Sequence, residues 1–272
     1  MESHDPILLP KAVTRRRALL LAGASLLARP LAAQVRDLHD AINKAGRQRM
    51  LSQRCAKAWL ALGLSVRADL AERALSESMA LFDRQLVELR SFVTKPDSRA
   101  TYQSLDGAWS AYKTALVGSA PQRKSADSVV ALGNRVLELA HQGTLQLEQI
   151  SGKPVGRLVN IAGRQRMLSQ RVGALVLAAA WRVQPGSTQR GLDEAHAEFL
   201  RAHALLKSAP ETSAAIRAEL DLAEQQFGFL DSALRALRSG GADARAMGDV
   251  FTTTERVLQV MERATGMYAA LG

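Results

Sequence analysis

Apolar side chains recur every three or four residues along most of this chain, and that spacing predicts amphipathic helices. Two such stripes comprise Leu75, Met79, Phe82, Leu86 and Leu89 in one segment, and Val250, Val257, Val260 and Met261 in another. No segment shows the alternation of apolar and polar residues that a half-buried strand requires. Ala and Leu dominate and aromatic residues make up only 4% of the chain, so the pattern indicates an all-α protein.

Prolines and glycines divide the helical stretches from one another. The dividing positions are Pro96, Pro121, Pro154, Pro185 and Pro210, with a further break at Gly240-Gly241. Proline belongs between helices because it lacks the donor that the helix interior needs. The predicted helices cover about 35–63, 66–93, 98–118, 124–150, 155–183, 188–208, 212–239 and 243–270. Short connections join these eight helices, so we expect antiparallel neighbours in up-down four-helix bundles.

Ten residues occur twice, as AGRQRMLSQR at 45–54 and again at 162–171. The similarity continues beyond this motif. Phe82 matches Phe199 at the same offset, and Arg135-Val136-Leu137 match Arg256-Val257-Leu258 after a shift of four residues. The chain therefore reads as a tandem duplication. We predict two four-helix units, 34–152 and 153–272, with the boundary at the short break 151–154.

The first 33 residues have the pattern of an export signal. Residues 14–20 read TRRRALL, an apolar run covers 18–28, and Leu31-Ala32-Ala33 is a small-residue cleavage site. The run is too short to cross a bilayer, which needs about 20 residues. We expect 1–33 to be a twin-arginine signal peptide cleaved after Ala33, which would place the protein in the periplasm. The general secretory route and an uncleaved anchor are the open alternatives.

The formal net charge is +10. Residues 1–33 hold five cationic and two anionic side chains, so the remainder carries +7. In the cytoplasm this balance would favour nucleic acid, whereas in the periplasm it favours anions, acidic proteins or a membrane surface. Cys55 is the sole cysteine and aligns with Val172; it has no disulfide partner and is predicted to pack as a small apolar residue.

The repeated motif gives each of two helices a cationic face. At 100° per residue one face carries Asn43, Arg47, Met50 and Arg54, and its copy carries Asn160, Arg164, Met167 and Arg171. Arg49 and Arg166 lie on the flank. Gly46 and Gly163 stand in mid-helix, where glycine costs about 1 kcal/mol relative to alanine, so we expect another helix to approach closely there. The motif contains no Asp or Glu, and Glu255 and Glu262 are expected to face solvent.

If the two motif helices face each other, their arginines converge around a pseudo-two-fold axis. Guanidinium groups bind oxyanions through paired hydrogen bonds, so such a site would suit a small symmetric anion. We expect Arg54 and Arg171 to touch one anion, with Arg47 and Arg164 in an outer shell. The alternative is that the arginines are solvated, or are bonded to helix carbonyls and to acids on other helices.

The motif resembles the N-terminal domain of the type IV pilus chemoreceptors (PilJ type), which commonly carries it in two copies. It is similar, more distantly, to the periplasmic sensor domain of the nitrate-responsive kinases of the NarX/NarQ type. The matching positions are Asn43, Lys44, Ala45, Gly46, Arg49, Met50, Ser52 and Arg54, whereas Arg47, Gln48, Leu51, Gln53 and, in the second copy, Ile161 depart from the nitrate-sensor pattern. The resemblance implies that Arg54 and Arg171 bind nitrate, with Arg49 and Arg166 as a second matching pair.

Two functions follow as hypotheses. The first is a periplasmic protein that binds or senses a small oxyanion, nitrate or nitrite first, and signals through a membrane receptor or kinase. The second is a ligand-free adaptor of a chemoreceptor or type IV pilus system, whose basic helices dock an acidic partner. Catalysis ranks third, because no His, Cys, Asp and Glu residues have metal-ligand spacing and no phosphate loop or nucleophile motif occurs. We expect that the protein is not an enzyme and that it binds no cofactor, metal or nucleic acid.

Overall fold

The computed structural model describes residues 34–238 and 243–272. Every regular element in this part of the chain is an α-helix, which confirms the all-α prediction. The helices are α1 (Leu38–Gly63), α2 (Ala68–Phe92), α3 (Pro96–Val117), α4 (Arg123–Ser151), α5 (Pro154–Ala180), α6 (Pro185–Ser208), α7 (Ala214–Arg238) and α8 (Ala244–Ala269). The predicted signal peptide and the Gly240-Gly241 break lie outside the described residues.

Three prolines occupy a different place from the one that the sequence predicted. Pro96, Pro154 and Pro185 were expected between helices, but each is the first residue of its helix. The first turn of a helix has no partner for its backbone N–H groups, so a residue without that donor is tolerated there, and the fixed φ of proline suits the helix. The helices therefore begin at these prolines.

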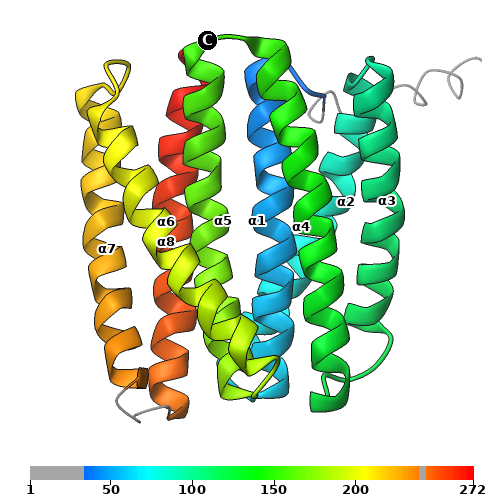
Figure 1. Ribbon diagram of the computed structural model, residues 1–272, viewed down its shortest axis with the longest axis vertical. Coiled ribbons are helices and arrows are strands. Elements are labelled where there is room, and N and C mark those ends of the chain that lie inside the picture. Colours follow the sequence, from blue (N-terminus) through cyan, green and yellow to red (C-terminus); the bar gives the residue numbers. More distant parts are fainter. Residues whose placement is uncertain (1–33, 239–242) are drawn as a thin grey trace, which may run out of the picture. The chain divides into compact units, whose positions relative to one another are not determined.

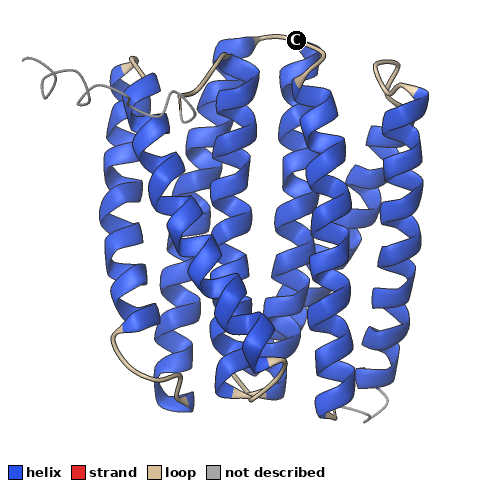
Figure 2. Ribbon diagram, turned by 180° about the vertical axis from the view of Figure 1, so that it is seen from behind, coloured by secondary structure: helices blue, strands red, loops and turns tan. Residues whose placement is uncertain are grey.

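The helices form two four-helix bundles that lie side by side within residues 35–272 (Figure 1). In the first bundle α1 packs against α2 and α4, and α3 packs against α4; in the second, α5 packs against α6 and α8, and α7 packs against α8. The most extensive contact of all joins α1 to α5, the two helices that carry the motif. Figure 2, seen from behind, shows the same arrangement, with helices and loops only.

Two backbone turns repeat the duplication. Ser65 and Arg67, between α1 and α2, have positive φ angles of 56° and 48°. Arg182 and Gln184, between α5 and α6, have φ angles of 56° and 41°. Non-glycine residues seldom adopt this left-handed conformation, so finding it twice at the same offset shows that both copies make the same turn.

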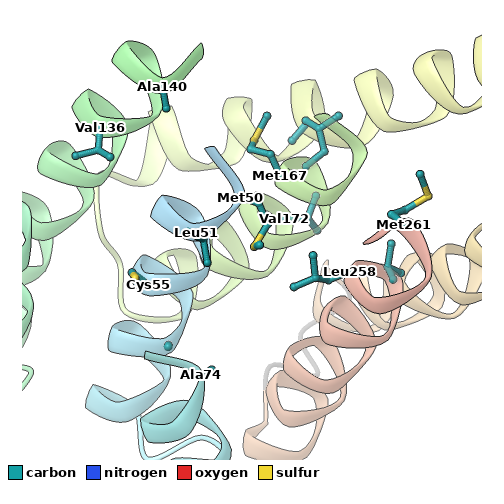
Figure 3. Close-up of a cluster of buried hydrophobic side chains, with 14 of the residues drawn as sticks. Met50, Leu51, Cys55, Ala74, Val136, Ala140, Met167, Val172, Leu258 and Met261 are labelled. Carbon is teal, nitrogen blue, oxygen red and sulfur yellow. The ribbon is translucent and has the colours of Figure 1, made fainter. Parts of the chain in front are cut away.

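The apolar core runs continuously through both bundles. Side chains from α1, α2, α4, α5 and α8 gather in one cluster (Figure 3). Cys55 is fully buried within it, and burial raises the pKa of its thiol to about 12, which confirms that it packs as an apolar residue. Within the described residues, no helix is apolar over a length that would span a bilayer.

Candidate functional site

The two motif helices cross at their glycines. A methyl group placed on Gly46 would lie 3.4 Å from Nη2 of Arg166 and 3.8 Å from the Cα of Gly163. The reverse holds for Gly163, where a methyl group would lie 3.5 Å from Nη2 of Arg49 and 3.8 Å from the Cα of Gly46. The close approach that the mid-helix glycines predicted is therefore present, and the guanidinium groups of Arg49 and Arg166 flank it.

Several of the repeated residues make the same contacts in both copies. Nη2 of Arg49 donates to the carbonyl of Asn160 at 3.1 Å, and Nη2 of Arg166 donates to the carbonyl of Asn43 at 3.1 Å. Each arginine thus crosses from its own helix to the other one. The hydroxyl of Ser52 donates to the Arg49 carbonyl, and that of Ser169 to the Arg166 carbonyl, both at 2.8 Å. The side-chain amide of Gln48 donates to the Phe82 carbonyl at 3.4 Å, and that of Gln165 to the Phe199 carbonyl at 3.2 Å. The arginine pair therefore links the two bundles, whereas the serine and glutamine pairs make the same contacts inside each bundle.

Arg54 lies against a carboxylate of the other bundle. Its Nε and Nη2 atoms donate to the two oxygens of Glu255 on α8, at 3.1 and 2.7 Å, and Nη1 donates to Ser78 on α2 at 3.2 Å. Lys57, fully buried, donates to the same carboxylate at 2.7 Å. Burial alone would raise the pKa of Glu255, but Lys57 and Arg54 hold it at about 2. Glu255 is therefore a firmly ionised counter-charge for two cations.

Arg171, the copy of Arg54, has neutral partners. Its Nη1 atom donates to the side-chain oxygens of Asn134 on α4 at 3.1 Å and Gln53 on α1 at 3.3 Å. No carboxylate among the described residues lies within ion-pair distance of it. Burial lowers the pKa of Arg171, and the more distant charge of Glu194 offsets that effect only in part. The pKa of Arg54, in contrast, is raised, because Glu255 outweighs burial there.

The flanking arginines show the same difference in their bonded partners, although burial lowers the pKa of both Arg49 and Arg166. Nη1 of Arg166 donates to Glu262 on α8 at 2.6 Å, and Arg47 contacts the same carboxylate. Nη1 of Arg49 instead lies 3.2 Å from Nδ1 of His141 on α4. Burial and the nearby charge of Arg164 lower the pKa of Arg49 to about 9. Burial, with the charge of Arg49, lowers the pKa of His141 to about 4, so this imidazole is neutral near pH 7.

The remaining predicted site residues have partners of their own. Arg164 contacts Glu198 on α6, and the amide of Asn160 contacts Glu148 on α4. Asn43 is buried and offers its backbone carbonyl to Arg166. Both contacts between side chains are charge-assisted pairs with acids on other helices, which is the arrangement that the sequence left open as an alternative.

The structure does not bring Arg54 and Arg171 to a common site. The partners of Arg54 come from α2 and α8, and those of Arg171 come from α1 and α4. Gly46 sets the crossing point, and Arg54 is eight residues further on, about 80° around the helix from it. Arg54 therefore points along the flank of α1. The pair that converges at the crossing is Arg49 with Arg166.

The expectation that Glu255 and Glu262 face solvent was also wrong. Both lie on the face of α8 that meets the motif helices, and both are partly buried. Their seven-residue spacing, which keeps two residues on one helix face, was the available signal. They are the principal charge partners of the motif arginines, and the motif itself does not reveal them because they lie about 100 to 200 positions away along the chain.

A pocket of about 260 Å³ opens beside Arg171, between α4, α5 and α6. Arg164 and His141 line it together with Arg171, and its remaining walls include Glu194, Glu198, Leu137, Met167 and Leu168. The pocket therefore places Arg171, a partly buried guanidinium with no bonded carboxylate, among an imidazole, an apolar wall and the carboxylates of Glu138, Glu194 and Glu198.

Comparison with known proteins identifies the family. The model for the type IV pili methyl-accepting chemotaxis transducer N-terminal family matches residues 31–133 and 151–244, which together exceed half of the chain. Neither the search of curated proteins nor that of solved structures returned a significant match. The two matched segments begin close to the two copies of the motif and each contains one copy. The chain therefore belongs to the PilJ family of chemotaxis transducer N-terminal domains.

Proposed function

We propose that this protein is a periplasmic sensory module that binds a small oxyanion, nitrate or nitrite first, and reports it to a membrane receptor or kinase. Membership of a chemotaxis transducer family supports a signalling role over a catalytic one. The observation that supports an anionic ligand is the setting of Arg171, a partly buried guanidinium that lies beside a pocket and is bonded to amide oxygens.

The energetics of Arg171 favour an anionic ligand. Removing a guanidinium from water without a counter-charge is unfavourable, and amide oxygens compensate only part of that loss. A bound anion would restore the missing charge and add charge-assisted hydrogen bonds of about 1.5–3 kcal/mol each. Arg171 therefore contributes to binding more than a neutral donor in the same place would.

The adaptor hypothesis fits the geometry less well. A docking surface must be exposed, but Arg49 and Arg166 are fully buried at the crossing of α1 and α5. Arg54 keeps only 16% of its side-chain surface exposed and is paired with Glu255. An acidic partner could not reach Arg49 and Arg166 without separating the bundles, and at Arg54 it would have to compete with Glu255.

Calorimetry with nitrate and with nitrite tests the ligand. We expect Arg171→Ala to weaken binding by about 1.5–3 kcal/mol, the range for one charge-assisted hydrogen bond. Arg54→Ala is the matched control, and it should affect binding less because Glu255 already neutralises Arg54. A folded wild-type protein that binds no small anion would overturn the proposal, and equal loss in both variants would move the site away from the pocket.

Export to the periplasm is a separate part of the proposal. It rests on the arginines at 15 and 16 ahead of a short apolar run. Replacing both by lysine should retain the precursor in the cytoplasm, because twin-arginine signals are recognised through that pair. Cell fractionation followed by N-terminal sequencing measures both export and cleavage after Ala33. Unchanged export of the double variant would point to the general secretory route.

A further inference from the structure

The fourth helices of the two bundles correspond residue by residue near the motif. Arg135-Val136-Leu137 on α4 align with Arg256-Val257-Leu258 on α8. The same register makes Asn134 the equivalent of Glu255 and His141 the equivalent of Glu262. The contacts agree, since Arg171 donates to Asn134 whereas Arg54 donates to Glu255. At both positions α8 supplies a carboxylate and α4 supplies a neutral group.

The difference concerns the charge balance around equivalent arginines. On the α8 side, Glu255 compensates Arg54 and Lys57, and Glu262 compensates Arg47 and Arg166. On the α4 side, the equivalent positions carry an amide and an imidazole, next to Arg171 and Arg49. The motif arginines and the fold are therefore the same on both sides, but Lys57 aligns with Ala174, and the fourth helix supplies carboxylates only on the α8 side. On the α4 side Glu198 of α6 contacts Arg164, and Arg171 has no bonded carboxylate.

We propose that the carboxylate of Glu255 is a built-in substitute for the ligand, and that it fills at Arg54 the position that a planar monoanion takes at Arg171. The chain would then hold one open anion site, in the pocket between α4, α5 and α6, and one equivalent site that it closes itself. This inference rests on the proposed function for the open site. It adds the number of sites, their location and the chemical class of the ligand.

The substitute itself indicates the class of ligand. A carboxylate is planar and singly charged, and Arg54 grips it through two adjacent donors at 3.1 and 2.7 Å, the side-on geometry that suits planar oxyanions. Nitrate, nitrite and short carboxylates share this shape and charge. Glu138, Glu194 and Glu198 line the open pocket and disfavour a second negative charge. Leu137 and Met167 form an apolar wall that suits a short apolar group.

The first test closes the open site. Asn134→Glu should place a carboxylate beside Arg171, as Glu255 does beside Arg54, and should lower the affinity for nitrate and for acetate at least about tenfold, because a tethered group competes at high effective concentration. Asn134→Gln is the matched control, with the same length but no charge, and it should bind within about threefold of wild type. Unchanged affinity in Asn134→Glu would overturn the inference.

The second test opens the closed site. Glu255→Asn, which copies the residue of the other bundle, should raise the calorimetric stoichiometry from one anion to two and should regain thermal stability when nitrate or acetate is added. Glu255→Gln fills the same space without the charge and should recruit an anion less well. Stoichiometry that stays at one in folded Glu255→Asn would contradict the inference; if that variant does not fold, the Asn134→Glu result decides.

The outcomes separate the inference from the proposed function. If the wild type binds one anion and the variants change neither affinity nor stoichiometry, the proposed function stands and the inference is overturned. A wild type that binds none, together with a Glu255→Asn that binds one, removes the proposed function and retains the substitute role of Glu255. Absence of binding in both proteins overturns both. Nitrate and acetate in separate titrations distinguish an inorganic from an organic source, and tighter binding of sulfate would contradict the planar monoanion.

Discussion

The two bundles use the same ten residues and balance their charges in different ways. In the bundle contact around Arg54, the carboxylates of α8 compensate the buried cations, and the pKa of Arg54 is raised above its ordinary value. Around Arg171 the corresponding helix supplies neutral groups, and burial leaves the pKa of that arginine lowered. An identical motif therefore fixes how two helices cross, but the helices packed against it decide the electrostatics of each copy.

The largest expected effect comes from removing the counter-charge of one bundle. Glu255→Ala leaves the fully buried Lys57 without a carboxylate and leaves Arg54 only the exposed Glu77 at 3.6 Å, so it should lower the free energy of unfolding by about 3 kcal/mol. Asn134→Ala, the equivalent change in the other bundle, removes only a neutral acceptor and should lower it by about 1 kcal/mol or less. Urea unfolding of both variants measures the difference. Equal losses would show that the two arginine environments do not differ.

The pH dependence of stability should reveal the same carboxylate. The pKa of Glu255 is about 2 in the folded protein and near 4.5 in an unfolded chain, so its stabilising contribution is complete above about pH 4.5. Protonation removes that contribution as the pH falls from about 4.5 towards 2. The gap in unfolding free energy between wild type and Glu255→Gln should therefore narrow over this range, by up to about 3 kcal/mol. A gap that stays constant with pH would contradict the ion pairs.

The smallest expected effect concerns the parts that the two copies share. Ser52→Ala and Ser169→Ala each remove a hydrogen bond of 2.8 Å to a carbonyl of the same helix and a longer one of 3.4 Å accepted from the next glutamine. Each should lower the free energy of unfolding by about 1 kcal/mol, and by the same amount within about 0.5 kcal/mol. Thermal and urea unfolding of the two variants test whether the contacts that the two copies share contribute equally to stability. A large difference between the two losses of unfolding free energy would show that the two copies are equivalent in backbone structure only.

The helices and the duplication were predictable from the sequence, because periodicity and proline positions are local properties. The close approach at Gly46 and Gly163 was predictable too, since a costly glycine in mid-helix needs a reason. The charge partners were not. Glu255 is 201 positions from Arg54, and no local pattern states which face of α8 will meet α1. The motif therefore identifies the arginines at the helix contact, but the prediction of which two converge was wrong.

The expected convergence of Arg54 and Arg171 failed for a related reason. A helical wheel gives the angle of each residue around its own axis, but not the direction from which the neighbouring helix arrives. The contact between Gly46 and Gly163 fixes that direction, and it brings Arg49 and Arg166 together instead. A prediction that had centred the wheel on the glycines would have chosen the flanking pair.

The contact between α1 and α5 also has a consequence for how such a protein can change over generations. In a dimer of identical chains, every substitution appears on both sides of the axis, so a useful change on one side carries its copy on the other. Here both halves belong to one polypeptide and are encoded separately. Asn134 and Glu255 can therefore differ, and one half is free to specialise in recognition while the other specialises in holding the pair together.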